Sequence, residues 1–205
     1  MKRGKFIVFE GGDGAGKDTQ IALMKKHFGT ETFVYTRDPG GTEIGMKLRA
    51  MLQYGKDLCE EAELFLLLAA RAEVAYKVIE PALAAGKNVV ANRFDLSTYA
   101  YQIYGRRRER KAKLIKTMSE LARRKAVPDL VILLDVPPEV GLARSRKRAQ
   151  KVTRFEEEAL AFHRRVQKGY RAGAKHFRHV ITVDSNRPPE AVWADVEKAL
   201  KTVVR

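Results

Sequence analysis

The feature that most constrains the fold is a glycine-rich segment, residues 11–17, placed directly after a short apolar run. The run at residues 5–9 is β-branched and aromatic, which is typical of a buried strand. After the segment, apolar residues recur at approximately helical spacing from Ile21 to Phe28, and Gly29 can end that helix. A strand, a glycine-rich turn and a helix in this order predict a loop whose N–H groups and helix N-terminus bind phosphate oxygens.

The segment matches the pattern G-x-x-x-x-G-K of nucleotide-binding loops, in which the lysine reaches the terminal phosphates of a nucleoside triphosphate. It departs from that pattern at Asp18, where a Ser or Thr normally contacts Mg²⁺. We therefore expect Lys17 to be catalytic and the metal site to be unusual. The predicted ATP-binding residues are Gly11, Gly12, Asp13, Gly14, Ala15, Gly16, Lys17, Asp18 and Thr19.

Four further apolar runs, at residues 33–36, 88–91, 130–135 and 179–183, are interpreted as strands with helical segments between them, the longest at residues 60–85. Strands that alternate with helices predict parallel pairing and right-handed crossovers. A chain of 205 residues with 45% hydrophobic content can bury one α/β core, so we expect a single domain over residues 1–205. Ligands of such sheets bind beyond the carboxyl ends of the strands.

Cysteine content and hydropathy indicate the compartment. The single Cys59 cannot form an intrachain disulfide, and its surroundings offer no metal-ligand spacing, so a reducing environment is expected. The N-terminal apolar run is too short for a signal peptide, and none reaches the roughly 18 residues of a membrane span. We expect a soluble, cytoplasmic protein.

The formal net charge of +15 is concentrated in one region. Residues 105–155 contain 16 Lys or Arg against five Asp or Glu. Such a region could bind nucleic acid or a polyphosphate substrate, or could consist of solvated helix faces. Solvated surface is the preferred interpretation of the basic run at residues 106–111. The run at residues 144–148 differs because it follows the fourth predicted strand, close to the expected ligand edge.

Four motifs, in order, resemble those of thymidylate kinases: residues 9–20, the sequence Thr-Arg-Asp-Pro-Gly-Gly-Thr at 36–42, residues 93–102, and Arg154-Phe155-Glu156. Their spacing spans essentially the whole chain. The resemblance implies a P-loop NTPase-like fold, with a five-stranded parallel sheet flanked by helices and a short lid at about residues 144–154. It also implies a homodimer that uses Mg²⁺ and transfers the ATP γ-phosphoryl to dTMP, giving dTDP.

By this resemblance, Arg93 is a catalytic residue that clamps the acceptor phosphate, and Asp13 faces the acceptor side. Arg37 and Arg49 are candidates for the same phosphate cluster, although Arg49 fits a surface helix equally well. Because the loop has no arginine of its own, the chain resembles the bacterial-like type in which a lid arginine stabilises the developing charge. Arg146 or Arg148 is the preferred candidate, and Arg154 is a third; the sequence does not choose between them.

The resemblance also assigns the base site. Arg71 matches an arginine that donates to thymine O4, Thr98 a polar position near the base edge, and Tyr101 an aromatic that selects deoxyribose, although Tyr101 also fits an ordinary amphipathic-helix aromatic. Leu67 stands where the family usually has a phenylalanine that stacks on thymine. Phe65 lies about 200° around the helix and cannot replace it. We therefore predict weak acceptor binding, with Leu67→Phe lowering the acceptor KM.

The metal site shows two departures together. Asp18 replaces the hydroxyl residue of the loop, and Asn92 replaces the Asp that normally precedes the arginine at 93. One carboxylate is gained and one is lost. We hypothesise that Asp18 supplies, directly or through water, the carboxylate that Asn92 no longer provides for Mg²⁺. A shifted register with Thr19 is the alternative, although helix geometry turns it about 100° away.

The leading functional hypothesis is an ATP-dependent dTMP kinase. The alternatives are a kinase of another nucleoside or deoxynucleoside monophosphate, which Leu67 leaves open, and a catalytically impaired P-loop protein that binds nucleotides or nucleic acid. Retention of Lys17, Arg93 and Arg71 argues against the last, because a non-catalytic binder does not need a phosphate clamp together with a base-reading arginine. ATP and dTMP are therefore the expected partners, without nucleic acid or a membrane.

Overall fold

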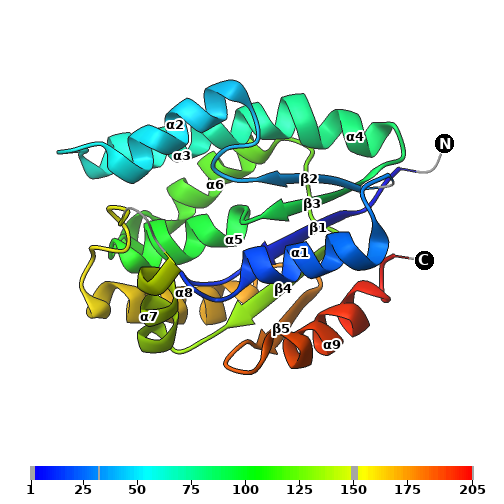
Figure 1. Ribbon diagram of the computed structural model, residues 1–205. Coiled ribbons are helices and arrows are strands. Elements are labelled where there is room, and N and C mark those ends of the chain that lie inside the picture. Colours follow the sequence, from blue (N-terminus) through cyan, green and yellow to red (C-terminus); the bar gives the residue numbers. More distant parts are fainter. Residues whose placement is uncertain (1–2, 32, 149–151, 205) are drawn as a thin grey trace.

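The computed structural model describes residues 3–31, 33–148 and 152–204. Its centre is a parallel sheet of five strands in the order β2-β3-β1-β4-β5 (Figure 1). Every strand lies within one residue of a run predicted from the sequence, so the predicted fold class is confirmed. The strands are β1 (Phe6–Glu10), β2 (Phe33–Arg37), β3 (Asn88–Asn92), β4 (Leu130–Asp135) and β5 (Val180–Asp184).

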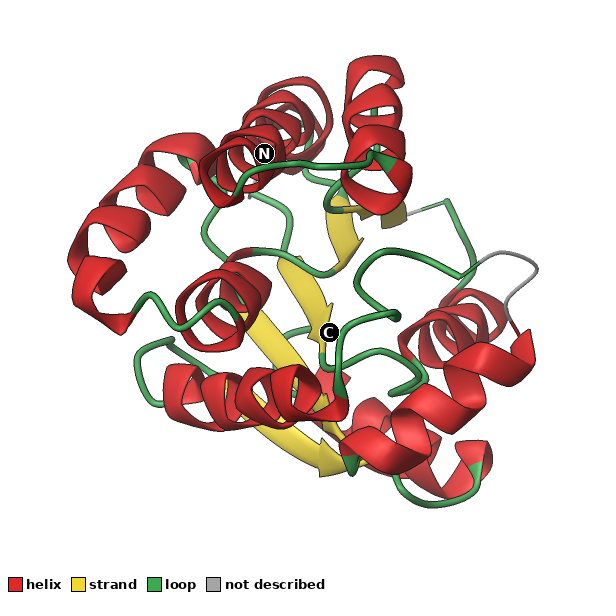
Figure 2. Ribbon diagram, turned by 90° about the vertical axis from the view of Figure 1, so that its left-hand side faces the viewer, coloured by secondary structure: helices red, strands yellow, loops and turns green. Residues whose placement is uncertain are grey.

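Helices connect the strands and cover both faces of the sheet (Figure 2). The segment predicted as one helix at residues 60–85 is continuous but contains a π-helical stretch, η1, and Gly86 follows it with φ +80°. A second π-helix, η2, extends α5. The helices are α1 (Lys17–Phe28), α2 (Glu43–Tyr54), α3 (Glu60–Val74), η1 (Ala75–Ile79), α4 (Glu80–Ala84), α5 (Asp95–Thr98), η2 (Tyr99–Gly105), the 3₁₀ turn η3 (Glu109–Lys111), α6 (Ala112–Arg123), α7 (Pro138–Arg148), α8 (Leu160–Ala174) and α9 (Pro189–Leu200).

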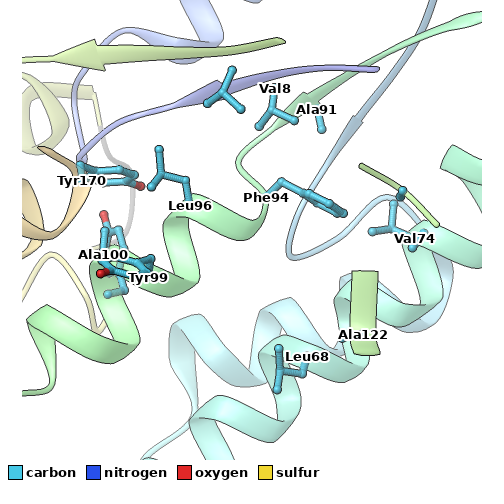
Figure 3. Close-up of a cluster of buried hydrophobic side chains, with 14 of the residues drawn as sticks. Val8, Leu68, Val74, Ala91, Phe94, Leu96, Tyr99, Ala100, Ala122 and Tyr170 are labelled. Atoms are coloured by element: carbon cyan, nitrogen blue, oxygen red, sulfur yellow. The ribbon is translucent and has the colours of Figure 1, made fainter. Parts of the chain in front are cut away.

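Alternation along β1 builds two cores, because successive side chains of a strand point to opposite faces. Phe6 and Val8 belong to the core beneath α3, α5, α6, α8 and η2, part of which Figure 3 shows. Ile7 and Phe9 belong to the core beneath α1 and α9. A sheet buried on both faces explains why its strands are continuous apolar runs.

Strand register brings the predicted site residues to one edge of the sheet. Phe9 of β1 and Arg37 of β2 both lie opposite Asn92 of β3. The phosphate loop after β1, Arg37 and the residues after Asn92 therefore emerge side by side. Among the described residues, no helix is both long and apolar enough to cross a membrane.

Candidate active site

The loop between β1 and α1 has the predicted order of strand, glycine-rich turn and helix. Gly11, Gly14 and Gly16 all have positive φ, and Lys17 begins α1. A Cβ at Gly14 would lie 1.8 Å from the carbonyl oxygen of Gly141, so the loop backbone packs directly on α7. Glycine at 14 is thus required both by its backbone angle and by this contact.

The Lys17 side chain is buried against the phosphate loop. Its Nζ donates hydrogen bonds to the carbonyl oxygens of Gly11 at 2.9 Å and Gly12 at 2.7 Å. Burial, and then the positive charge of Arg93, lower the pKa of Lys17 to about 7. A phosphate oxygen would supply the negative charge that this ammonium needs.

Arg93 contacts both the phosphate loop and Tyr101, a predicted acceptor residue. It has a left-handed φ of 71°, a conformation that is uncommon for a residue with a side chain and is often found at functional sites. Its Nη1 donates to Gly11 O at 2.8 Å and to the Tyr170 hydroxyl at 2.6 Å, while Nη2 donates to Asp13 Oδ1 at 2.8 Å and to the Tyr101 hydroxyl at 3.1 Å. These bonds fix the guanidinium beside the loop.

Asp13 accepts hydrogen bonds from both Arg93 and Tyr101. Arg93 donates to its Oδ1, and the Tyr101 hydroxyl donates to its Oδ2 at 2.9 Å. Burial alone would raise the pKa of Asp13, but the charges of Arg93 and Lys17 hold it below its ordinary value. Asp13 is therefore a carboxylate that orients Arg93 and Tyr101.

Three arginines form a cationic cluster at this edge. Arg49 donates to Pro39 O at 3.1 Å, and its pKa is lowered by burial and then by the neighbouring charges of Arg37 and Arg93. Like charges repel unless an anion lies between them. The cluster therefore has the electrostatics of a phosphate site, which favours the phosphate role of Arg49 over that of a surface helix residue.

Asp18 and Asn92 lie in direct contact. Asn92 Nδ2 donates to Asp18 Oδ1 at 2.9 Å, and Arg37 Nη2 lies 3.6 Å from the same oxygen. In the described part of the chain, no three His, Cys, Asp or Glu side chains gather as a protein-only metal cage would require. A lone carboxylate beside an amide suits Mg²⁺, which binds through one or two carboxylates together with waters and substrate phosphates.

A cavity of about 360 Å³ lies elsewhere, between α6 and η2, but the cavity at the strand edge contains six of the eight predicted acceptor residues, all except Arg37 and Thr98. Its volume is about 120 Å³. It is lined by Asp13, Asp38, Pro39, Arg49, Leu52, Gln53, Leu67, Arg71, Arg93, Ser97, Tyr101, Gln102, Thr153 and Phe155.

Arg71 is fully buried at the floor of this cavity, where it is held by two carboxylates. Its Nε donates to Asp38 Oδ2 at 2.6 Å, and its Nη1 lies 3.0 Å from Asp95 Oδ1. Among the described residues, Nη2 makes one hydrogen bond, to Phe94 O at 3.0 Å. Since Nη2 carries two N–H groups, one remains for a ligand.

Thr98 contacts Arg71, the candidate base-reading arginine. Its Oγ1 accepts from Arg71 Nη1 at 2.7 Å, and it is absent from the cavity wall. Thr98 can therefore orient Arg71, and its place near the base edge stays a prediction. Phe65 points away, with 54% of its surface exposed, as the helical spacing predicts, while Leu67 lines the cavity.

The lid arginines separate into different environments. Arg146 on α7 is exposed and contributes to lowering the pKa of His163, although burial is the main cause; His163 Nδ1 lies 4.0 Å from Asp13. Arg148 ends α7, and its side chain lies outside the described part. Arg154 instead pairs with Glu63 on α3, at 2.6 Å. Arg146 therefore remains a candidate lid residue, while Arg144 of the same helix lines a hollow beside the loop.

The basic run at residues 106–111 is not simply solvated. Arg106 pairs with Glu63 and Glu158, and Arg108, only 7% exposed, pairs with Glu60. The preferred interpretation of this run as solvated surface is therefore wrong for these two residues. Their guanidiniums pair with carboxylates of the chain, of which Glu63 is buried and Glu60 is exposed.

Eight of the 14 residues that line the cavity were not predicted as binding residues, among them Phe155 and Asp38. Phe155 was noted only as part of the Arg-Phe-Glu motif, and Asp38 only as part of the motif at 36–42. Each motif placed its residue near the site without showing where the side chain points.

Comparison with known proteins identifies the chemistry. The family model described as thymidylate kinase matches residues 9–196. The chain is 43% identical to a thymidylate kinase of Synechococcus over 202 residues, or 95% of each chain. It is 43% identical to that of Thermomicrobium roseum over 203 residues, or 96% of each chain. A solved thymidylate kinase from Ehrlichia chaffeensis superposes with a TM-score of 0.79 at 29% identity, covering 97% of this chain and 99% of that one.

A triphosphate loop that faces an arginine-lined cavity provides what phosphoryl transfer between two nucleotides requires: alignment and charge neutralisation. The comparisons favour dTMP as acceptor over another monophosphate and over a binder without catalysis. The fold is P-loop NTPase-like, as its structural neighbour shows. This chain belongs to the thymidylate kinase family and is an ATP-dependent dTMP kinase.

Proposed function

We propose that the donor phosphates of ATP bind in the loop at residues 11–19, with Lys17 on the terminal phosphates. A hollow of about 240 Å³ beside the loop, lined in part by Thr19, Arg144 and Arg187, supports a place for the rest of the donor nucleotide. The positive φ angles of the loop glycines and the buried ammonium support this role.

The acceptor phosphate would lie among Arg37, Arg49 and Arg93, whose charges repel one another without an anion. Arg93 would present its planar set of N–H donors to the phosphate, and Asp13 would hold it in place. The transfer itself needs no general base, because the attacking atom is a phosphate oxygen that already carries negative charge. Arg146 is the proposed lid residue that approaches the transferring group, and Arg148 remains a candidate.

The base of dTMP would lie in the 120 Å³ cavity, with the free N–H of Arg71 donating to O4. Cytosine presents an amino group at that position and cannot accept this bond, which supports thymine. The Tyr101 hydroxyl, held by Asp13, would limit the space at the sugar.

Mg²⁺ would be held by Asp18, with the Asn92 amide beside it, together with ATP phosphates and water. When bound, the ion would neutralise charge on the phosphates of ATP. The close pairing of these two side chains supports the proposed exchange of one carboxylate for another. Thr19 remains the alternative ligand.

A homodimer through α3 and α6 is supported by apolar side chains left on their outer faces. Phe65 and Tyr76 are 54% and 58% exposed on the α3–η1 helix, and Leu114 and Leu121 are 59% and 80% exposed on α6. The Arg124 guanidinium lies 4.9 Å from the Tyr76 ring centroid, so the two faces adjoin. An apolar patch of this kind is typical of an interface.

We also propose one catalytic domain that works in the cytoplasm. The sheet shared by both cores supports a single domain, and the exposed free Cys59 fits a reducing compartment. Nucleic acid is not proposed as a partner, because Arg106 and Arg108 of the basic region are paired with carboxylates of the chain.

The observation that carries the site assignment is that Arg93 donates hydrogen bonds both to the loop, at Gly11 O, and to Tyr101 of the cavity wall. Arg93→Lys should lower kcat with dTMP by about 10²-fold, because a point charge cannot reproduce the aligned donors. Arg110→Lys, at an exposed position, is the matched control. The assay is ADP formation with dTMP, dUMP, dCMP and dGMP. Full activity of Arg93→Lys would contradict the assignment, and a better acceptor than dTMP would contradict the proposed base contacts.

A further inference from the structure

Glu63 on α3 is a buried carboxylate that none of the roles above uses. It is 1% exposed. Its oxygens accept from Gln102 Nε2 at 2.8 Å, Arg106 Nη2 at 2.8 Å and Arg154 Nη2 at 2.6 Å. Gln102 belongs to η2, Arg106 follows it, and Arg154 belongs to the lid. Glu63 therefore ties the helix of the base site to the lid.

The charges in this cluster favour docking of the lid. Burial alone would raise the pKa of Glu63, but bonds and charge from Arg106, together with Gln102 and Arg154, hold it below its ordinary value. Arg106 also pairs with Glu158, and so shares its charge between two carboxylates. A buried carboxylate is costly without full pairing, so Arg154 supplies charge that Glu63 needs.

Docking of Arg154 also positions its neighbour, Phe155. The Phe155 ring lines the acceptor cavity and meets the Tyr101 ring nearly edge to face, with centroids 5.9 Å apart and planes at 88°. The guanidiniums of Arg154 and Arg106 lie 5.4 Å and 5.8 Å from its centroid. The two cations that bind Glu63 therefore also hold this ring at the cavity wall.

α3 contributes no aromatic residue to the cavity wall. Leu67 offers no aromatic surface to a base. In the described part of the chain, Tyr101 and Phe155 are the aromatic residues of the wall, and Tyr101 is already fixed through its hydroxyl to Asp13. The Phe155 side chain has no hydrogen-bonding group, so its ring is available to pack against a base.

We propose that Phe155 packs against the thymine ring of the acceptor and performs the role that Leu67 cannot. Glu63 is then a positioning residue, which holds Phe155 at the wall by docking Arg154. Binding of the base and docking of Arg154 on Glu63 are then coupled. Since this rests on the proposed place of dTMP, Arg93→Lys serves as the reference for that placement.

The first experiment moves the aromatic ring from position 155 to position 67. Phe155→Leu should raise the KM for dTMP about tenfold, as expected for a lost aromatic stack, and change the KM for ATP less than twofold. Adding Leu67→Phe should recover most of that loss. A dTMP KM within twofold of wild type in Phe155→Leu, or no recovery in the double variant, would overturn the proposal. If Arg93→Lys is also without effect, the placement of dTMP fails instead.

The second experiment tests the docking. Arg154→Gln and Glu63→Gln should each raise the KM for dTMP about as much as Phe155→Leu, with kcat reduced less than threefold. Combining Arg154→Gln with Phe155→Leu should add little, because both remove the same ring contact. Glu60→Gln, which alters an exposed carboxylate of the same helix, is the control. Additive losses, or a fall in kcat with a raised ATP KM in Arg154→Gln, would overturn the positioning role. Arg154 is only partly buried, so its variant remains informative if Glu63→Gln does not fold.

Discussion

The low pKa of Lys17 predicts that donor binding takes up a proton. Its Nζ contacts the Gly11 and Gly12 carbonyl oxygens, and burial with the charge of Arg93 lowers its pKa to about 7. Bound phosphates bring several negative charges to within contact of the ammonium. Opposite charge favours the protonated form, so the pKa must rise on binding.

The size of the effect follows from the two pKa values. With a free pKa near 7, about one tenth of Lys17 is protonated at pH 8, and nearly all of it when the bound pKa returns to its ordinary range near 10. Binding should therefore take up about 0.9 proton at pH 8, about 0.5 at pH 7 and about 0.1 at pH 6.

Calorimetry of ADP binding with Mg²⁺, in buffers of different ionisation enthalpy, measures this uptake as a slope. Lys17→Arg is the control, because arginine keeps its charge across this range while phosphate groups of the ligand titrate equally in both proteins. The difference in slope between wild type and Lys17→Arg should grow from pH 6 to pH 8. Equal slopes at pH 8 would refute the low pKa of Lys17.

Three other expectations follow from the site and the surface. Asp18→Ser should lower kcat at least tenfold with Mg²⁺, because the proposed metal site would lose its carboxylate, and adding Asn92→Asp should restore most of it; additive losses would contradict the exchange. Phe65→Glu with Leu121→Glu should convert the proposed dimer to a monomer in sedimentation velocity, because charge would be buried at the contact, whereas an unchanged dimer or a monomeric wild type would contradict the proposed interface. Arg71→Lys should lower the free energy of unfolding in urea by about 2–3 kcal/mol, since lysine cannot replace every charged hydrogen bond, and a loss below about 0.5 kcal/mol would contradict the network.

Much of the fold could be predicted because its signals are local. The five strands are continuous apolar runs, and the loop before Lys17 needs glycine at particular backbone angles. The place of Arg93 was also predictable, since parallel strands end at one edge. Such features depend on a few neighbouring residues and on the rule for crossovers.

The side chains of the lid could not be predicted in the same way. A run of arginines has the same sequence pattern whether water or carboxylates surround it. Arg106 meets Glu63 across 43 positions, and Arg154 meets it across 91. Phe155 reaches the cavity through these distant pairs, so no local pattern indicates its direction.

The contact between Asp18 and Asn92 gives a physical reason why the two departures occur together. Two carboxylates at this separation would repel, and one would have to take up a proton or wait for a cation. An amide opposite one carboxylate instead forms a hydrogen bond of 2.9 Å, as observed. The loop carboxylate is thus compatible with a neutral partner at 92 whether or not a metal ion is bound. A serine or threonine in the loop would leave the carboxylate to position 92, so each arrangement would place one carboxylate beside the proposed phosphate site and would avoid a pair.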